Sequence, residues 1–528
     1  MDFATAILVL VAYLLRLHQL IPGGEWLFAQ KYLMAASIAA MVFRGRGFVW
    51  RDLVKTPLDW AMLIYCGFIV FHEVEPWETF KEVIKLFLFY AVTVQALCNS
   101  RRLFLYMCTW AGCIAVLALV TLDSAFGIDF TDSQSLLPMY DERYCLNLSV
   151  YNNPNALGHT LALGFPMFYY AFFTNRGAGL RFLSFAMWGM VAVAVYLTES
   201  KGAFLVGGGL ACLPFWIGRN WIFRVLLLVF IAGIGIGALQ YLPRMEVIQS
   251  SGAVANDEGI WGRLAVWNVA MEDLQANSSG VGWKNFEPYI SYVDAMGKMI
   301  VFKKGPHNSY VAVSAELGYA GLFFYLLVLA VCARTVLQFG ALNQDQERAK
   351  MLLIIVLLGY AISGWLIERP YHIEYFFIAG ACAAFQRQRL LGEELRQENN
   401  DGAKEFEKAQ RQELKRGASP LLLHGGTDPL LLAGREQVLQ PEEARVVATN
   451  WLQPLVVGSY AMVPVQEPLR TTSEPSALQA DEDPPAALGD LFKPMRWRRI
   501  GLAELSLSFL ALQGVLEIWK WTLNRFFF

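Results

Sequence analysis

Residues 303–324 read KKGPHNSYVAVSAELGYAGLFF. The stretch opens with two lysines, a proline and a His-Asn pair, and it continues into an apolar run typical of a membrane helix. That run still contains Glu316, and an ionisable side chain is costly inside a bilayer. The stretch therefore predicts a membrane helix that begins at a polar site, to which other parts of the chain should also contribute.

The composition of the whole chain is that of a polytopic membrane protein. Of its 528 residues, 56% are hydrophobic and 17% are charged, whereas about 25% are charged in a typical soluble domain. The apolar residues come in blocks that are long enough to cross a hydrocarbon core, so we predict an all-α protein with about twelve transmembrane helices. The predicted spans are residues 3–21, 27–43, 57–72, 82–98, 103–122, 156–174, 181–198, 202–218, 221–241, 309–333, 351–368 and 371–387.

Lysines and arginines in the short loops predict the orientation of these spans. Basic loops, such as those with Arg44, Arg101 and Arg334, alternate along the chain with acidic or mixed loops. This alternation places both ends of the bundle in the cytoplasm. Residues 242–308 then form a large external loop between the ninth and tenth helices, and a loop of this length usually carries function. We expect short helices within it, one of them around 260–275.

The chain divides into three parts by composition. Residues 1–387 form the bundle, and residues 388–495 read as a cytoplasmic, largely disordered tail that starts with a charged, helix-prone stretch. Residues 496–528 begin with basic residues and tryptophan and continue as an apolar helix. One stripe of this helix is polar, with Gln513, Glu517, Lys520 and Asn524. We expect it to lie in the inner interface, and a thirteenth span is the alternative.

Two polar clusters lie at predicted span ends on the external side. In YNNPNALGHT (151–160), Asn155 and His159 are four residues apart and share a helical face. A helix cap with a buried structural histidine explains this cluster equally well. In TESKGAFL (198–205), Ser200 and Lys201 precede a returning helix, whose N-terminus favours anions. A snorkelling lysine in a tight turn is the alternative interpretation.

The large external loop and the stretch that follows it supply the third and fourth clusters. Arg263 lies on a predicted short helix where its guanidinium could bind phosphate, although it could also be an ordinary surface arginine. Lys284 follows the GVGW turn at 280–283. His307 and Asn308 stand at the start of the next span, and His307 could act as a general base or bind a phosphate oxygen. Glu316 is the second candidate base, but it is deeper.

The fifth cluster is the short external hairpin LIERPYHIEYF (366–376). It contains Arg369 and His372 as candidate substrate-binding residues, together with Glu368 and Glu374. An arginine paired with a glutamate within the hairpin would be the structural explanation. All five clusters meet span ends on the same side of the membrane, which predicts an outward-facing pocket at the membrane surface.

The motifs in these clusters resemble those of the O-antigen ligase and O-antigen polymerase superfamily. The resemblance is carried by NPNALGH (153–159), SKGA (200–203), GRLAVW (262–267), GVG (280–282) and PHNSYVAVSAELGYAGL (306–322). It covers about residues 150–325 in motifs and 1–387 in topology, but not residues 388–528.

The resemblance implies a glycosyltransferase of the bacterial inner membrane that faces the periplasm and needs no metal or other cofactor. The donor would be an undecaprenyl-diphosphate-linked glycan. The acceptor would be lipid A-core or a similar hydroxyl for a ligase, another lipid-linked repeat for a polymerase, or a protein. Arg263 would bind the diphosphate, and His307 would assist the acceptor or the leaving group. Lys201 stands where many relatives have arginine, which keeps the charge and loses bidentate geometry.

Two other classes of function fit the sequence less well. A polysaccharide transporter predicts ionisable residues at mid-membrane depth and matching halves with broken helices, whereas these polar groups gather at one surface. A metal-dependent transferase predicts paired external carboxylates, and the spacing of Asp129 with Asp132 does not point to a metal site. The eight cysteines form no CxxC pair, and the net charge of -2 gives no indication of nucleic-acid binding.

Overall fold

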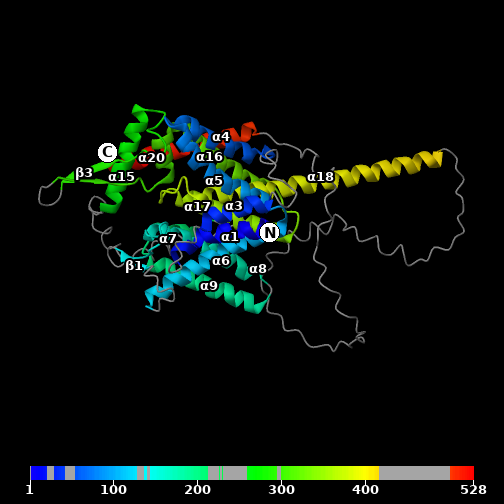
Figure 1. Ribbon diagram of the computed structural model, residues 1–528, viewed down its shortest axis with the longest axis horizontal. Coiled ribbons are helices and arrows are strands. Elements are labelled where there is room, and N and C mark those ends of the chain that lie inside the picture. Colours follow the sequence, from blue (N-terminus) through cyan, green and yellow to red (C-terminus); the bar gives the residue numbers. More distant parts are fainter. Residues whose placement is uncertain are drawn as a thin grey trace. The chain divides into compact units, whose positions relative to one another are not determined.

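The protein is described from a computed structural model (Figure 1). The structure describes residues 2–20, 29–41, 54–127, 136–139, 143–175, 177–211, 225, 229, 258–293, 299–415 and 500–527. The helices in the first half are α1 (Asp2–Leu15), α2 (Leu17–Leu20), α3 (Ala29–Met41), α4 (Pro57–His72), α5 (Pro76–Ala96), α6 (Ser100–Ala125), α7 (Pro154–Ala162), α8 (Gly164–Thr174), α9 (Ala178–Leu197) and α10 (Lys201–Ala211). The helices in the second half are α15 (Glu258–Ala276), α16 (Ser309–Gln338), α17 (Gln344–Ser363), α18 (Ile373–Lys415) and α20 (Leu502–Phe527).

Most predicted spans within the described residues coincide with helices, and two of them are broken. The span expected at 3–21 divides at Arg16, whose φ of 51° lies in the left-handed region, into α1 and α2. The span expected at 156–174 divides at Leu163 into α7 and α8. The helix expected around 260–275 corresponds to α15. The span expected at 221–241 lies outside the described residues, apart from positions 225 and 229.

Two short hairpins depart from the all-α prediction. Strands β1 (Leu136–Met139) and β2 (Arg143–Leu146) pair antiparallel, as do β3 (Tyr289–Val293) and β4 (Met299–Lys303). In the second hairpin Tyr289 lies opposite Lys303 and Val293 opposite Met299. Both of its strands are rich in aromatic and β-branched residues, which favour extended backbone. The hairpin projects from the bundle next to α15 (Figure 1).

The helix α16 is bent at Gly318, and the loop after α15 fills the bend. Gly318 has φ 68° and ψ −168°, so the helical hydrogen bonds are interrupted there. The N–H groups of Val281 and Gly282 donate instead to the carbonyls of Ala315 (2.9 Å) and Glu316 (2.8 Å). In return, the N–H of Tyr319 donates to the carbonyl of Ser278 (3.2 Å). This exchange attaches the predicted external loop directly to the helix that follows it.

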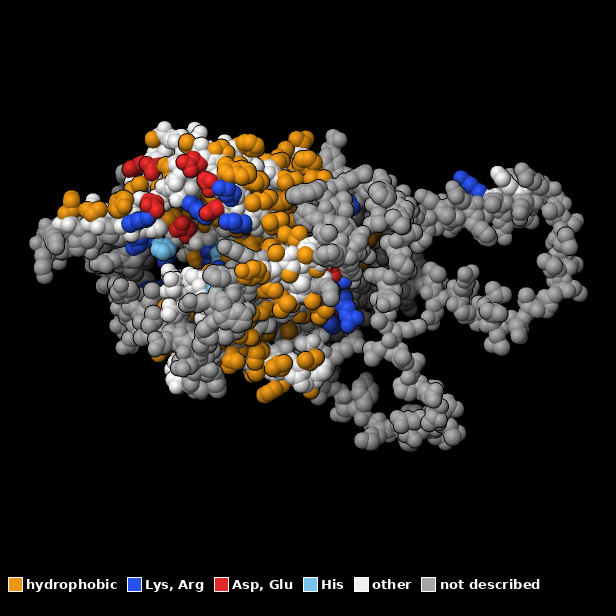
Figure 2. Space-filling model, in the orientation of Figure 1, with side chains coloured by type: hydrophobic (Ala, Val, Ile, Leu, Met, Phe, Trp, Pro, Cys, Tyr) orange, Lys and Arg blue, Asp and Glu red, His pale blue; other side chains and the backbone are white. Residues whose placement is uncertain are grey.

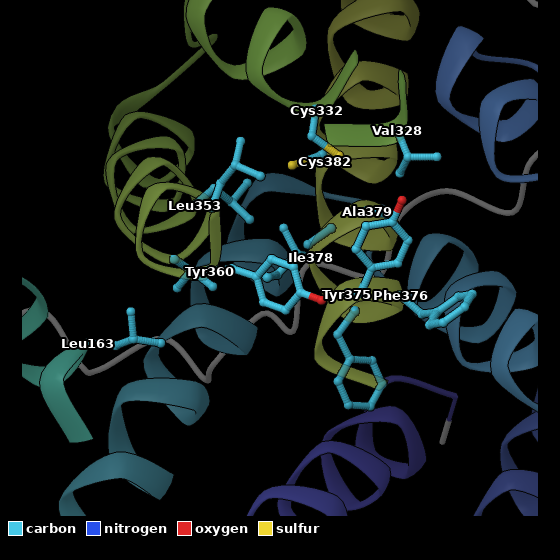
Figure 3. Packing of buried hydrophobic residues seen from close by; sticks show 14 of the residues in the cluster. Leu163, Val328, Cys332, Leu353, Tyr360, Tyr375, Phe376, Ile378, Ala379 and Cys382 are labelled. Atoms are coloured by element: carbon cyan, nitrogen blue, oxygen red, sulfur yellow. The ribbon is translucent and has the colours of Figure 1, made fainter. Parts of the chain in front are cut away.

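The core is built around the first part of α18, whose side chains pack against α16 and α17 (Figure 3). Tyr375 and Phe376, near the start of α18, are both buried. Cys382 of α18 lies beside Cys332 of α16, and both thiols are free and buried. Tyr375 stacks on Tyr325 of α16, with ring centroids 4.9 Å apart. Large aromatic side chains therefore hold the helices that carry the predicted site.

Four helices in the described part of the chain are long and apolar enough to cross a membrane: α6, α9, α16 and α20. The shorter helices α1 and α4 are also apolar. The fold is thus mostly helical and consistent with a helical membrane protein, while the number of spans stays a prediction. Figure 2 shows apolar side chains over the middle of one face and a group of charged side chains at one end.

The structure describes the start of the predicted C-terminal tail and most of the C-terminal segment 496–528. The helix expected at 371–387 continues without a break to Lys415, so the beginning of the predicted tail is helical. The predicted tail beyond that residue, 416–495, lies outside the described residues. The C-terminal helix, α20, packs against α16, where the Ser508 hydroxyl donates to the carbonyl of Phe323 (2.9 Å).

Candidate functional site

The helix α15 brings Arg263 to His307. Arg263 and Trp267 are four residues apart and share a face of this helix. The Trp267 indole N–H donates to the carbonyl of Pro306 (2.7 Å), which fixes this face against the residue before His307. Burial, together with the smaller effect of the charges of Arg263 and Lys304, lowers the pKa of His307 to about 4. The imidazole is therefore neutral at neutral pH and can accept a proton.

Lys304 joins this pair as a second cation. Its side chain crosses the backbone of Gly262, where an added Cβ would lie 3.0 Å from both Cδ and Cε of the lysine. The glycine next to Arg263 thus leaves room for a lysine that precedes His307 by three residues. The two lysines at 303–304 are visible in the sequence, but nothing there indicates which of them reaches α15. The structure assigns that position to Lys304.

Three of the predicted clusters contain a residue with strained backbone. His307 (φ 49°), Lys284 (φ 60°) and Glu199 (φ 48°) all occupy the left-handed region. This conformation costs free energy in a residue with a side chain, and such residues concentrate at functional sites. The strain at His307 is held in place because its N–H donates to the carboxylate of Glu368.

Glu368 belongs to the hairpin that follows α17, and this hairpin is fastened to the start of α16. The N–H of Ser309 donates to the carbonyl of Gly364 (2.7 Å), and its hydroxyl donates to the carbonyl of Ile367 (2.8 Å). The N–H of Arg369 in turn donates to the Ser309 hydroxyl (2.9 Å). These bonds place the Glu368 carboxylate against the backbone of residues 305–307. Sequence reasoning placed Glu368 in the hairpin but did not identify this contact.

Close packing of two glycines joins α7 to the start of α10. A Cβ at Gly158 would lie 2.7 Å from the Thr198 hydroxyl, and a Cβ at Gly202 would lie 2.9 Å from Nε2 of His159. His159 is buried, and its Nδ1 lies 3.0 Å from the Ser363 hydroxyl. The charges of Arg369 and Arg263 both act on this imidazole, so the α7 cluster adjoins the α15 cluster.

Ser200 and Lys201 stand at the N-terminus of α10, as predicted. The Ser200 hydroxyl donates to the side-chain oxygen of Asn155 (3.0 Å). Arg143 of β2, a residue that sequence reasoning missed, donates to the same oxygen (2.9 Å) and to the carbonyl of Thr198 (3.1 Å). Because Arg143 lies in β2, outside the motifs of the predicted clusters, no sequence pattern singled it out. Its guanidinium adds positive charge beside the N-terminus of α10.

Arg369 and His372 are bonded mainly within the bundle. Arg369 donates to the Thr160 hydroxyl (2.9 Å) and to the carbonyl of Ala156 (2.7 Å), and it pairs with Glu374 (3.3 Å). Nε2 of His372 lies 2.8 Å from the Tyr13 hydroxyl. The pairing of an arginine with a glutamate in this hairpin matches the structural explanation given above. Their direct part in substrate binding stays a prediction.

The remaining candidates are Asn308 at the N-cap of α16, Glu316 just before the bend in that helix, and Lys284 in the loop after α15. The side chain of Asn308 caps this helix by accepting from the N–H groups of Tyr310 and Val311, while its NH₂ is buried without a partner among the described residues. Glu316 is also buried, and its Oε2 has no hydrogen-bond partner there. The Lys284 ammonium pairs with Glu82 of α5 (2.8 Å), at the exposed edge of the loop.

The arrangement has the parts expected for transfer from a polyanionic donor. Arg263 and Lys304 supply positive charge beside a neutral imidazole, and the N-terminus of α10 supplies further donors. Residues 161–326 match the model of the O-antigen ligase family. This match supports the O-antigen ligase and polymerase superfamily.

The O-antigen ligase match includes Lys201, Arg263 and His307, and it begins just after His159. It covers less than a third of the chain. It supports an O-antigen ligase or polymerase type of function in general, and members of this family are membrane glycosyltransferase-like enzymes. Together with the apolar helices, it indicates a membrane protein of the bacterial inner membrane. No curated protein matches the chain.

We expect Trp267→Phe to reduce glycan transfer about three- to tenfold, because the lost indole N–H is worth about 1 kcal/mol and holds Arg263 at His307. The aromatic volume is largely kept, so the amount of protein in the membrane should not change. Transfer rates in purified protein would measure this effect. Trp77→Phe, at an exposed tryptophan of α5, is the matched control, and an equal loss in both variants would contradict a specific role for the indole N–H.

Proposed function

We propose that the protein transfers a glycan from undecaprenyl diphosphate to an acceptor hydroxyl at the periplasmic face of the inner membrane. The observation that carries this proposal is the meeting of Arg263, Lys304 and His307, produced by the hydrogen bond from Trp267 to Pro306. A ligase that acts on lipid A-core or a similar acceptor is the first candidate. A polymerase that extends another lipid-linked repeat uses the same chemistry.

In the proposed reaction the acceptor oxygen attacks the anomeric carbon of the glycan. The bond from that carbon to the diphosphate oxygen breaks, and undecaprenyl diphosphate leaves with the electron pair. Arg263 and Lys304 stabilise the negative charge that grows on the diphosphate, because they are held in place before the reaction starts. Neutral His307 takes the proton of the acceptor hydroxyl. The carboxylate of Glu368 keeps His307 in its strained conformation through the backbone.

The decisive experiment incubates the purified protein with the lipid-linked glycan and with separate acceptors. Product on lipid A-core would support ligation, and longer lipid-linked chains would support polymerisation. Glycan found on protein would point to the third acceptor class. The absence of any transfer from undecaprenyl diphosphate, with folded protein, would contradict the proposal.

The low pKa of His307 predicts a specific pH dependence of transfer. In the free enzyme the imidazole stays neutral down to pH values near its pKa of about 4. A bound diphosphate offsets the charges of Arg263 and Lys304, so it favours the protonated imidazole and raises this pKa. Because kcat/KM reports the free enzyme and kcat reports the substrate complex, kcat should fall at a higher pH than kcat/KM as the solution is acidified.

Initial rates over a pH series would measure both profiles, with Glu82→Gln as the matched control, because Glu82 pairs with Lys284 at the exposed edge of the loop. The control should leave both limbs in place. Coincident acid limbs in kcat and kcat/KM would count against His307 as the base that faces the diphosphate.

A further inference from the structure

The C-terminal helix α20 carries a polar stripe that the proposed site does not use. Its polar members are Ser506, Gln513, Glu517, Lys520 and Asn524; together with the apolar Leu510 they recur every three or four residues, and all six are exposed. The repeat averages three and a half residues, which is the spacing of a seam between two helices that pack along their length. A further feature of the stripe is its charge, since it includes Glu517 and Lys520.

The other side of α20 is buried against α16. Leu512, Val515 and Trp519 are buried on this side. Glu504 pairs with Arg334 near the end of α16, and Ser508 bonds to Phe323 closer to its middle. The two helices therefore run in opposite directions, and α20 also contacts α15 (Figure 1). A helix that starts beside Arg334 and reaches α15 runs from the predicted cytoplasmic side to the predicted periplasmic side.

The length of α20 is consistent with a path across the membrane. α20 is among the helices that are long and apolar enough to cross a membrane. The polar stripe extends over about 27 Å, from Ser506 to Asn524, at the rise of an α-helix. This is close to the thickness of the hydrocarbon core, so lipid head groups cannot cover the whole stripe. A charged side chain that faces lipid at that depth is unfavourable unless another polar group meets it.

Within one chain, the two charged side chains of the stripe form only a long, exposed ion pair with each other. Glu517 and Lys520 lie 3.5 Å apart, and their side chains are 70% and 51% exposed. In a parallel pair of such helices related by a two-fold axis, each stripe residue meets its own counterpart, so the two Glu517 and two Lys520 side chains occupy adjacent layers and can form one cluster of zero net charge. Gln513 and Asn524 both donate and accept hydrogen bonds, so each can pair with its own counterpart. Gly514 has open space around its Cβ position, which permits close approach of a second helix.

We propose that α20 crosses the membrane beside α16 and that its polar stripe pairs with the same stripe of a second copy of this chain. The self-complementary charges favour a second copy over a different partner, since a different partner would need a matching pattern of its own. The proposal concerns a part of the chain outside the family match, and it is independent of the proposed glycan transfer.

Disulfide crosslinking of the full-length protein in membranes tests the pairing. Gln513→Cys places a thiol on the stripe, and Ile518→Cys places one on the exposed apolar side of the same helix. Both variants are made with Cys108→Ala, which removes an exposed native thiol. We expect a crosslinked dimer from Gln513→Cys at a yield at least about fivefold above Ile518→Cys, the scale of a direct coupling between contacting groups. Equal yields, or a product with the mass of another protein, would overturn the pairing.

Charge exchange supplies a test that does not depend on a thiol. Glu517→Lys should reduce the dimer fraction, because two lysines from each copy then face each other. Lys520→Glu should reduce it in the same way, and the double variant should restore the dimer. Ile518→Ala, on the apolar side, should leave the dimer fraction unchanged. A double variant no better than either single variant, with all proteins at normal levels in the membrane, would overturn the charge pairing.

The course of α20 through the membrane is tested separately. Asn524→Cys, also with Cys108→Ala, should react with a membrane-impermeant maleimide added to the periplasmic side of intact cells whose outer membrane has been permeabilised. Arg334→Cys, predicted to lie on the cytoplasmic side, should react only after the inner membrane is opened. Labelling of Asn524→Cys only after that opening would show an interfacial helix and overturn the proposal.

Discussion

Replacing Arg263 with alanine is expected to lower the turnover of glycan transfer by about 10²–10³-fold, the range found when one preorganised charge-stabilising donor is removed from an active site. The guanidinium lies beside His307 and Lys304, where a leaving diphosphate would develop charge. Arg263→Lys should retain part of the activity, because it keeps the charge and loses the planar pair of donors. Turnover in purified protein and surface-glycan ladders in cells would both report the change.

The matched control is Lys303→Ala. This lysine lies in β4, four residues before His307, but it pairs with Glu287 and its side chain is half exposed. Glycan transfer by this variant should stay near the level of the unchanged protein. The comparison separates the loss of a positive charge at the candidate site from the loss of a positive charge elsewhere in the loop. A normal glycan ladder from Arg263→Ala, at a normal level of protein, would contradict the role proposed for this residue.

Gly318→Ala is expected to destabilise the folded protein by at least about 3 kcal/mol. The backbone of this residue occupies a region of φ and ψ that is open essentially to glycine alone. An added Cβ would also overlap the carbonyl oxygen of Ser278, which accepts the hydrogen bond from Tyr319. The clash is with backbone, so no rotation of a side chain can relieve it. Thermal unfolding of the purified protein, followed by size-exclusion chromatography, would measure the loss.

Gly112→Ala in α6 is the matched control for that experiment. Gly112 has helical backbone, and an added Cβ there meets nothing within 4 Å. Alanine should be neutral or stabilising by up to about 1 kcal/mol, because it lowers the entropy of the unfolded chain. If both glycine variants unfold at the same temperature as the unchanged protein, the exchange between loop and helix does not hold the fold together.

Most of the helices were accessible from sequence, because each depends on local pattern, whereas the side of the membrane on which the site lies stays a prediction. Apolar blocks gave α4 with its bounds as predicted, and Asn153 caps α7 before Pro154, as the motif indicated. The clustering of Arg263 with His307 followed from the resemblance. The break at Arg16 was missed because no glycine or proline marks it. The break at Leu163 does have a signal that was overlooked: Gly164 follows it, and Pro166 has no N–H to donate to the Ala162 carbonyl.

The contacts that complete the candidate site could not be predicted from local sequence patterns. Lys304 and Lys303 are neighbours with the same chemistry, and only the path of the backbone sends one to Gly262 and the other to Glu287. Arg143 reaches Asn155 from a hairpin that the apolar pattern does not reveal. Glu368 contacts His307 through a backbone N–H, which any residue type could supply. Such long-range contacts depend on tertiary packing and leave no local periodicity.

The hydrogen bonds that Val281 and Gly282 donate to the carbonyls of α16 also limit how far residues 278–282 can move away from this helix. If residues 278–282 moved away, the carbonyls of Ala315 and Glu316 would lose these hydrogen-bond donors beside the buried Glu316 carboxylate, at a cost of about 1–3 kcal/mol each. This stretch is therefore expected to stay attached to α16. If the protein transfers a long glycan as proposed, we expect any movement that admits it to occur in the segments on either side, α15 and the hairpin formed by β3 and β4.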